Sequence, residues 1–230
     1  MKYTFDGRVR FSETDAEGFL RVENIINYFQ DCSTFQSEDL GIGVEHLREQ
    51  KRVWVLSSWQ VDILKYPKLG DKIIIGTFAY GFKSFLGYRN FYMQDENGEY
   101  LAKASSIWAY LNTETFKPEK PDLADMDKYG IEEKLDMDYK SRKIEIPNEL
   151  KTLEPIEVKE HHLDVNNHVN NSQYITMAAL CTKQEKRPSS IRVEYRNQAF
   201  LGDVIYPYTD GNVVDLRSAD GTSYCVVELC

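Results

Sequence analysis

The sequence is poor in the residues that build metal clusters, disulfide frameworks and membrane spans. It has four cysteines and four histidines in 230 residues, and no two cysteines have a CxxC or zinc-finger spacing. We therefore expect reduced thiols and a cytoplasmic protein, without metal or cofactor. No apolar run is long enough to span a bilayer, and the first residues lack the composition of a signal peptide. A formal net charge of −9 without a basic stripe argues against nucleic-acid binding.

Hydrophobic periodicity in the first half predicts one long helix and an antiparallel sheet. We expect a strand at 3–12 and a helix from Val22 to Leu40, which Gly41 and Gly43 end. Four strands are expected after the helix, at 52–64, 72–80, 85–94 and 100–111. Residues 113–153 lose the alternation, which predicts a linker that wraps the surface with one short helix.

The second half repeats this order of elements. We expect a strand at 155–161, a polar turn and then a helix from Ser172 to Leu180. Further strands are expected at 190–198, 204–209, 213–218 and 223–229. An internal repeat of this kind predicts two copies of one architecture.

The polar turn at 161–174 is the best candidate for a site of chemistry. It contains three His, one Asp and four Asn in fourteen residues. Such groups at the entrance of a helix can stabilise charge that develops on a substrate. When Asp15 is placed over Asp164, the two helices coincide, but Phe19 meets His168. Only the second half therefore keeps the polar set.

Residues 163–171 closely resemble the Asp-x-Asn-x-His-Val-Asn-Asn signature of plant and bacterial acyl-acyl-carrier-protein thioesterases. Further segments are similar to motifs in the first half of that family: 53–56, 65–71, 104–108 and 112–115. The resemblance implies an α+β fold with two tandem hotdog domains, each a curled antiparallel sheet wrapped round a long helix. It implies an N-terminal hotdog at 1–112 with the acyl pocket, a linker at 113–153 and a catalytic C-terminal hotdog at 154–230.

The resemblance also implies a function, namely hydrolysis of the thioester of fatty acyl-acyl carrier protein, which releases free fatty acid and ends chain elongation. The partner would be acyl carrier protein that carries the acyl-phosphopantetheine substrate. Lys140, Arg142, Lys143 and the turn at 183–187 are candidate docking residues, and an ordinary solvated surface is the alternative. Both a monomer and a homodimer are compatible with the pattern.

One departure from the family leaves the function open. Gln198 and Ala199 stand where the family usually has a Glu, often followed by Cys. This position therefore offers neither a thiol nucleophile nor a carboxylate base. An acyl-coenzyme-A thioesterase and a non-catalytic hotdog that binds acyl ligands remain alternatives.

Thioester hydrolysis needs an oriented water and donors for an oxyanion. We expect His168 to assist proton transfer, because the ordinary pKa of imidazole lies near neutrality. Asn166 would position the water or the carbonyl, and Asp164 would orient that amide or accept the proton. Gln198 would supply a hydrogen bond but no base. Backbone N–H groups of Asn167 and His168, expected at the helix start, are candidates for the oxyanion hole.

Structural interpretations compete with these roles. Asp164 could serve only as N-cap of the following helix, and Asn170 and Asn171 are expected to form turn and helix-entry hydrogen bonds. His161 and His162 are adjacent on an expected strand, so they would point to opposite faces. Their spacing does not support a metal site.

Overall fold

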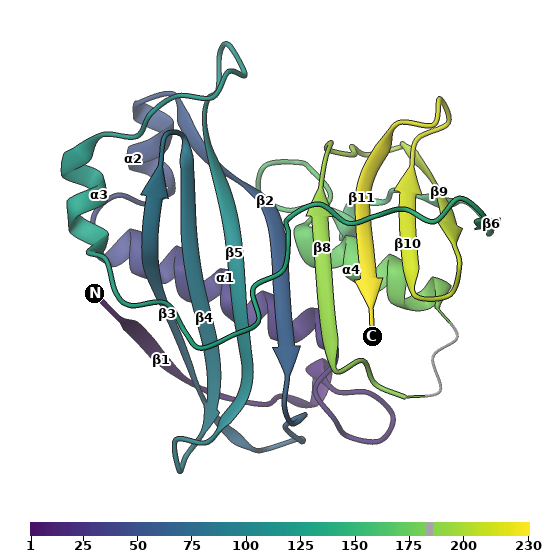
Figure 1. Cartoon of the computed structure of the whole chain (residues 1–230), viewed down its shortest axis with the longest axis horizontal. Helices are drawn as coiled ribbons and strands as arrows, with labels where there is room; N and C mark the ends of the chain where they lie inside the picture. The colour runs from purple at the N-terminus through teal and green to yellow at the C-terminus, as the bar shows by residue number, and fades with distance from the viewer. Residues whose placement is uncertain (183–185) are drawn as a thin grey trace. The chain divides into compact units, whose positions relative to one another are not determined.

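The computed structural model describes residues 1–182 and 186–230. The chain divides into two compact units, here called unit 1 and unit 2. Unit 1 comprises Met1–Ser57 and Val61–Tyr139, and unit 2 comprises Ser58–Gln60 and Lys140–Cys230. The division after Tyr139 falls within the segment that was expected to be a linker. In each unit one main helix accompanies an antiparallel sheet (Figure 1).

Unit 1 contains five strands, three α-helices and one 3₁₀ turn, all close to the predicted order. They are β1 (Tyr3–Arg8), η1 (Phe11–Glu13), α1 (Val22–Asp39), α2 (Val44–Glu49), β2 (Arg52–Ile63), β3 (Lys72–Lys83), β4 (Leu86–Asp95), β5 (Tyr100–Asn112) and α3 (Leu123–Tyr129). The strands lie in the order β1-β3-β4-β5-β2. The pairs β1·β3, β3·β4 and β4·β5 are antiparallel.

Helix α1 forms because its apolar residues recur at helical spacing, and most of them lie on one buried face, although Phe35 is exposed. Ile25, Ile26, Phe29 and Cys32 are fully buried, which is the pattern of a helix packed against a sheet. The helix ends where Gly41 takes a left-handed backbone with a φ of 67°, as predicted. The short helix α2 was not predicted, because six residues are too few for the periodicity to show.

Unit 2 repeats the arrangement with a shorter helix. Its elements are β6 (Lys151–Thr152), β7 (Ile156–Glu157), η2 (Glu160–His162), α4 (Asn171–Cys181), β8 (Ser190–Tyr195), β9 (Val204–Thr209), β10 (Val213–Arg217) and β11 (Ser223–Leu229). The strands lie in the order β8-β11-β10-β9-β6, and β7 also pairs with β9. All these pairs with a determined register are antiparallel.

Two predicted strands in unit 2 are shorter than expected. The strand expected at 155–161 is only β7, because the His162 Nδ1 accepts the Lys159 N–H at 3.0 Å and closes a 3₁₀ turn instead. The strand expected at 190–198 ends at Tyr195. The N–H groups of the next two residues both donate to the Tyr224 carbonyl, at 2.9 and 3.1 Å, so the chain leaves the ladder there.

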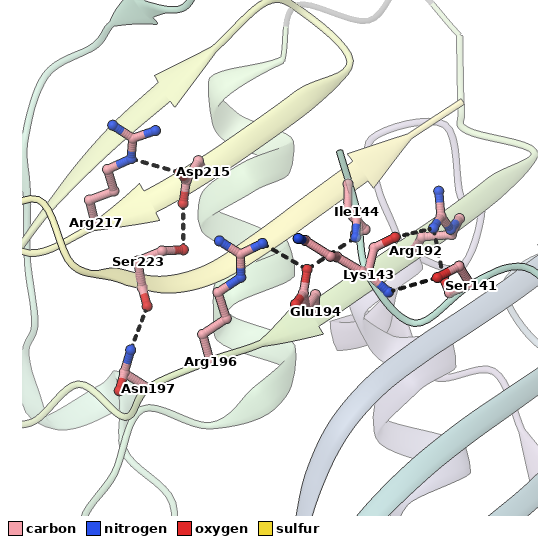
Figure 2. Close-up of polar contacts among 10 residues, drawn as sticks. All are labelled: Ser141, Lys143, Ile144, Arg192, Glu194, Arg196, Asn197, Asp215, Arg217 and Ser223. Carbon is pink, nitrogen blue, oxygen red and sulfur yellow. Dashed lines mark hydrogen bonds and ion pairs between the residues drawn. The ribbon is translucent and has the colours of Figure 1, made fainter. Parts of the chain in front are cut away.

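The two faces of the unit 2 sheet have different neighbours. On one face the Tyr195 hydroxyl donates to the Asn171 carbonyl at the start of α4, at 2.9 Å. On the other face the Glu194 carboxylate accepts the N–H of Ile144 at 3.0 Å, as Figure 2 shows. Ile144 is only 1% exposed, so the segment before β6 covers this face with buried apolar contact and charged hydrogen bonds.

Candidate functional site

The polar stretch folds into a closed turn that Asp164 holds together. Its Oδ1 accepts the backbone N–H of Asn166 at 2.8 Å and that of His168 at 3.4 Å. The Asp164 N–H donates to the His168 carbonyl at 2.8 Å. Asn167 has a φ of 60°, a left-handed conformation that Asn tolerates better than most residues. Asp164 therefore fixes the backbone at the two candidate catalytic residues, Asn166 and His168.

Helix α4 begins after this turn and has its own cap. Asn170 is the N-cap, and its Oδ1 accepts the Ser172 N–H at 3.0 Å. The helix-entry role predicted for Asn170 is confirmed, and the alternative that Asp164 caps the helix is wrong. The N–H groups of Asn167 and His168 lie before the helix and donate to Asp164. The prediction that these groups sit at the helix start is therefore wrong, and their internal hydrogen bonds argue against a role as the oxyanion hole.

The same turn occurs in unit 1. The Oδ1 of Asp15 accepts the N–H groups of Glu17 and Phe19, each at 2.9 Å. The Asp15 N–H donates to the Phe19 carbonyl at 2.8 Å. Gly18 takes the left-handed position with a φ of 81°. The equivalence of Asp15 and Asp164 is thus confirmed, because both form the same hydrogen bonds. The turn in unit 1 has neither Asn nor His, so these residues are not needed to form it.

The second turn has the amide of Asn166 and the imidazole of His168 where the first turn has Glu17 and Phe19. Asn166 is exposed and His168 is half-buried. Within residues 1–182 and 186–230, neither the Asn166 amide nor the His168 imidazole has a side-chain hydrogen bond to the protein. Both groups can therefore bind a substrate or a water without first breaking an internal bond.

A second turn, at residues 199–203, is hydrogen-bonded to the residues that follow the Asp164 turn. The Val169 N–H donates to the Ala199 carbonyl at 3.0 Å, and the Ala199 N–H donates to the Tyr174 hydroxyl at 3.0 Å. The Phe200 N–H donates to the Asp203 carboxylate at 2.9 Å. These bonds place the Phe200 ring against the turn that carries the candidate site.

Gln198 directly precedes Ala199, the first residue of this second turn, and is exposed to solvent. Its side chain is exposed, and in the described part of the chain no hydrogen bond connects it to Asp164, Asn166 or His168. Asp164, Asn166 and His168 thus share one turn, and Gln198 stands on a different segment of the chain. A role for Gln198 stays a prediction that requires substrate to be present.

His161 and His162 lie in the 3₁₀ turn, so the prediction that a strand points them to opposite faces is wrong. Their ring centroids are 4.1 Å apart. Burial, followed by the nearby His161 and Lys159, lowers the pKa of His162. No group of three His, Cys, Asp or Glu among the described residues is arranged to hold a metal ion.

All four cysteines are free thiols, as predicted. Burial raises the pKa of Cys32 to about 12 and that of Cys225 well above its ordinary value. Burial also raises the pKa of Cys181. Thiols of this kind are poor nucleophiles, which favours water as the attacking group.

Two carboxylates of unit 2, Glu194 on β8 and Asp215 on β10, already form ion pairs with arginines. Figure 2 shows Glu194 bound to Arg196 at 2.8 Å and Asp215 bound to Arg217 at 2.6 Å. Burial acts to raise the pKa of Glu194, but the hydrogen bonds from Arg196 and the Ile144 N–H outweigh it and the net shift is downward. Neither carboxylate replaces the missing Glu as a base.

The predicted docking residues lie in two places. Lys140, Arg142 and Lys143 are exposed on the segment that covers the unit 2 sheet. In the turn at 183–187, residues 183–185 lie outside the described residues, so that part of the prediction has no structural counterpart here.

Comparison with known proteins identifies the family. Residues 1–123 match the model of the acyl-ACP thioesterase N-terminal domain, and residues 145–224 match the model of the C-terminal domain. The chain therefore belongs to the acyl-ACP thioesterase family, as the motif predicted.

Individual relatives are distant and longer. A chloroplastic acyl-[acyl-carrier-protein] hydrolase of Cuphea viscosissima is 25% identical over 220 residues, which cover 87% of this chain and 53% of the relative. A chloroplastic oleoyl-acyl carrier protein thioesterase of Arabidopsis thaliana is 25% identical, with 86% and 60% covered. The chain spans about half the length of these Cuphea viscosissima relatives.

Two solved structures share the fold. An acyl-ACP thioesterase from Bacteroides thetaiotaomicron has a TM-score of 0.88 at 23% identity, with 99% of this chain and 96% of that chain covered. The 12:0-ACP thioesterase from Umbellularia californica has a TM-score of 0.85 at 17% identity, with 99% and 96% covered. The predicted α+β, hotdog-like fold class is thereby confirmed. No helix among the described residues is long and apolar enough to cross a membrane.

Proposed function

We propose that this chain hydrolyses the thioester between a fatty acyl group and acyl carrier protein. One observation carries the proposal beyond family membership. Both units contain the Asp-closed turn, but only unit 2 places an unpartnered amide and imidazole on it, at Asn166 and His168. A turn that served architecture alone would not need these groups, as the turn with Phe19 demonstrates.

The geometry suggests a role for His168 and for Asp164 in the hydrolysis. A water attacks the thioester carbonyl, and His168 takes up its proton and returns one to the leaving thiolate. The Oδ1 of Asp164 is used by the turn, but its Oδ2 has no hydrogen-bond partner in residues 1–182 and 186–230. Asp164 can therefore hold the turn and still orient or deprotonate the water.

The oxyanion needs a donor other than the N–H groups inside the turn. The Asn166 side-chain amide is exposed and has no hydrogen bond to any other described residue, so we assign it this role. Gln198 would add a second hydrogen bond to the substrate. The N-terminal hotdog would supply the acyl pocket, with domain limits at 1–112, 113–153 and 154–230 as the motif analysis suggests.

The proposed partner is acyl carrier protein with its acyl-phosphopantetheine arm. Such a partner is acidic, and this chain is acidic as well, so docking requires local positive charge. Lys140, Arg142 and Lys143 are exposed and close together in sequence, which supports them as contacts. A cytoplasmic location and a monomeric or homodimeric state remain part of the proposal.

The decisive experiment measures release of fatty acid from a panel of acyl-carrier-protein thioesters and from the matching acyl-coenzyme-A series. The matched variant is His168→Phe, because it copies the residue of unit 1 and preserves an aromatic ring on the same turn. We expect turnover on carrier protein to fall by about 10²-fold or more in this variant. Equal wild-type rates on both carriers would favour an acyl-coenzyme-A thioesterase. Binding without release would favour a non-catalytic acyl-binding protein.

A further inference from the structure

The His168 imidazole contacts the aromatic ring of Phe200. The two ring centroids are 5.0 Å apart and the ring planes meet at 84°. This is the edge-to-face geometry that aromatic rings prefer. Phe200 is half exposed, with a relative accessibility of 50%, so burial of its own side chain does not explain its place.

The backbone of Phe200 is held firmly. Its N–H donates to the Asp203 carboxylate at 2.9 Å, and the Asp203 N–H donates back to the Phe200 carbonyl at 3.1 Å. The Tyr224 hydroxyl donates to the same carboxylate at 3.2 Å. The ring that contacts His168 therefore belongs to a turn whose backbone is fixed by several hydrogen bonds.

Unit 1 contains the corresponding contact between two other residues, Phe19 and Lys68. There Phe19 takes the place of His168, and the Lys68 ammonium lies 4.7 Å from the Phe19 ring centroid. The Lys68 N–H donates to the Asp71 carboxylate at 2.8 Å, as that of Phe200 does to Asp203. The contact between the two turns is thus a feature of the fold, and in unit 2 a neutral ring faces the imidazole where unit 1 has a cation.

Most functional histidines are oriented by a hydrogen bond to the second ring nitrogen. In the described residues the His168 ring donates no such bond to a carboxylate or a carbonyl, and no hydrogen bond joins it to Gln198. Something else must choose the ring rotamer, because a misplaced catalytic group loses much of its effect.

We propose that Phe200 is the positioning residue for His168, and that the edge-to-face contact sets the imidazole rotamer in place of the usual hydrogen bond. This inference rests on the proposed function, because it assigns the rotamer to proton transfer. Phe200 acts through His168 and has no chemical role of its own. A side chain that is apolar but not aromatic would fill the space without fixing the ring.

The test compares Phe200→Leu and Phe200→Tyr in the full-length chain. We expect Phe200→Leu to lower kcat by about 10-fold to 100-fold, with KM nearly unchanged. Phe200→Tyr retains the ring and should restore kcat to near the wild-type value. Lys68→Leu is the matched control, because it removes the corresponding contact from the unit 1 turn and should leave kcat unchanged.

A second measurement does not depend on activity. The imidazole carbon-bound protons of His168, assigned by their absence in His168→Phe, should shift in Phe200→Leu and not in Phe200→Tyr, since the ring current is lost only in the first. Unchanged His168 resonances in Phe200→Leu, or an unchanged kcat, would overturn the positioning role. A wild-type chain that hydrolyses no thioester would overturn the proposed function instead, and the resonances would still decide whether the Phe200 ring lies against the imidazole.

Discussion

Asp15 and Asp164 close two copies of the same turn, one in each unit of the chain. Each side-chain Oδ1 accepts the backbone N–H groups two and four residues further along. The copies differ in what they carry, because the fourth position is Phe19 in one and His168 in the other. A shared scaffold with different side chains separates the architectural role of the aspartate from any chemical role.

The first prediction uses this pair. Asp164→Asn keeps an oxygen that can accept both N–H groups, so the turn should survive, but it removes the negative charge. We expect kcat to fall by about 10²-fold if the carboxylate acts on the water, while Asp15→Asn leaves kcat within about twofold. Thioester hydrolysis and urea unfolding measure the two effects separately.

The alanine variants give the complementary result. Asp15→Ala and Asp164→Ala each leave two N–H groups without their acceptor, and each should cost about 1–2 kcal/mol of unfolding free energy. A wild-type kcat in Asp164→Asn would show that the aspartate serves the turn alone.

The second prediction concerns Asn166. If its amide stabilises the oxyanion, Asn166→Ala should lower kcat by about 10²-fold to 10³-fold. The fold should stay intact, because the side chain makes no hydrogen bond to the part of the chain that the structure describes. Glu17→Ala, at the equivalent position of unit 1, is the control for exposed surface change. A loss of stability without a loss of kcat would contradict the assignment.

The sequence predicted the repeated features of the fold well. The helix expected from Val22 to Leu40 is α1, and the turn expected at Asp164 recurs at Asp15 as the overlay required. These features depend on residue spacing within a short window, which a single sequence displays directly. The cluster of Asp164, Asn166 and His168 follows from the same local turn.

Features that depend on contacts across the fold were missed. The end of β8 at Tyr195 is set by the Tyr224 carbonyl, which lies far away in sequence. The contact of Phe200 with His168 likewise depends on a turn brought in by tertiary structure. The sequence does contain a signal, because the same Leu-Gly-Asp run follows Lys68 at 69–71 and Phe200 at 201–203. That match acquires meaning only when the contact of Lys68 with Phe19 is seen.

The third prediction concerns Gln198. Its exposed amide can offer the substrate a single hydrogen bond, worth about 0.5–1.5 kcal/mol, so Gln198→Ala should lower kcat/KM no more than about tenfold. Gln198→Glu introduces the carboxylate usual in the family and tests whether a base is missing. A loss as large as that in His168→Phe would place Gln198 among the essential groups.

The fourth prediction tests the exclusion of a thiol nucleophile. Cys32 and Cys225 are buried and have raised pKa values, so iodoacetamide at neutral pH should modify the exposed Cys230 first. We expect the modified protein to retain its thioesterase activity. Mass spectrometry of the peptides locates the label, and inactivation in step with labelling of Cys181 or Cys225 would contradict a water mechanism.

The fifth prediction concerns acid stability near the candidate site. The His162 Nδ1 accepts the Lys159 N–H, which only the neutral ring can do. Its pKa is lowered in the folded protein, by burial first and then by His161 and Lys159. A lowered histidine pKa means that the unfolded chain binds the proton more readily, so this stabilisation is complete above the ordinary pKa of about 6.5. It is lost as the pH falls from there through the folded pKa.

The equivalent residue of unit 1 shows that a side-chain oxygen can make the same hydrogen bond. The Glu13 carboxylate accepts the Arg10 N–H at 2.9 Å, in the same 3₁₀ capping arrangement. His162→Gln retains an acceptor that does not titrate, so its unfolding free energy should fall less than that of the wild type between pH 7.5 and pH 5. The difference should be small, because His162 is largely solvated and its interactions are screened. Parallel pH profiles of the two proteins in urea unfolding would show that the His162 turn does not contribute to acid sensitivity.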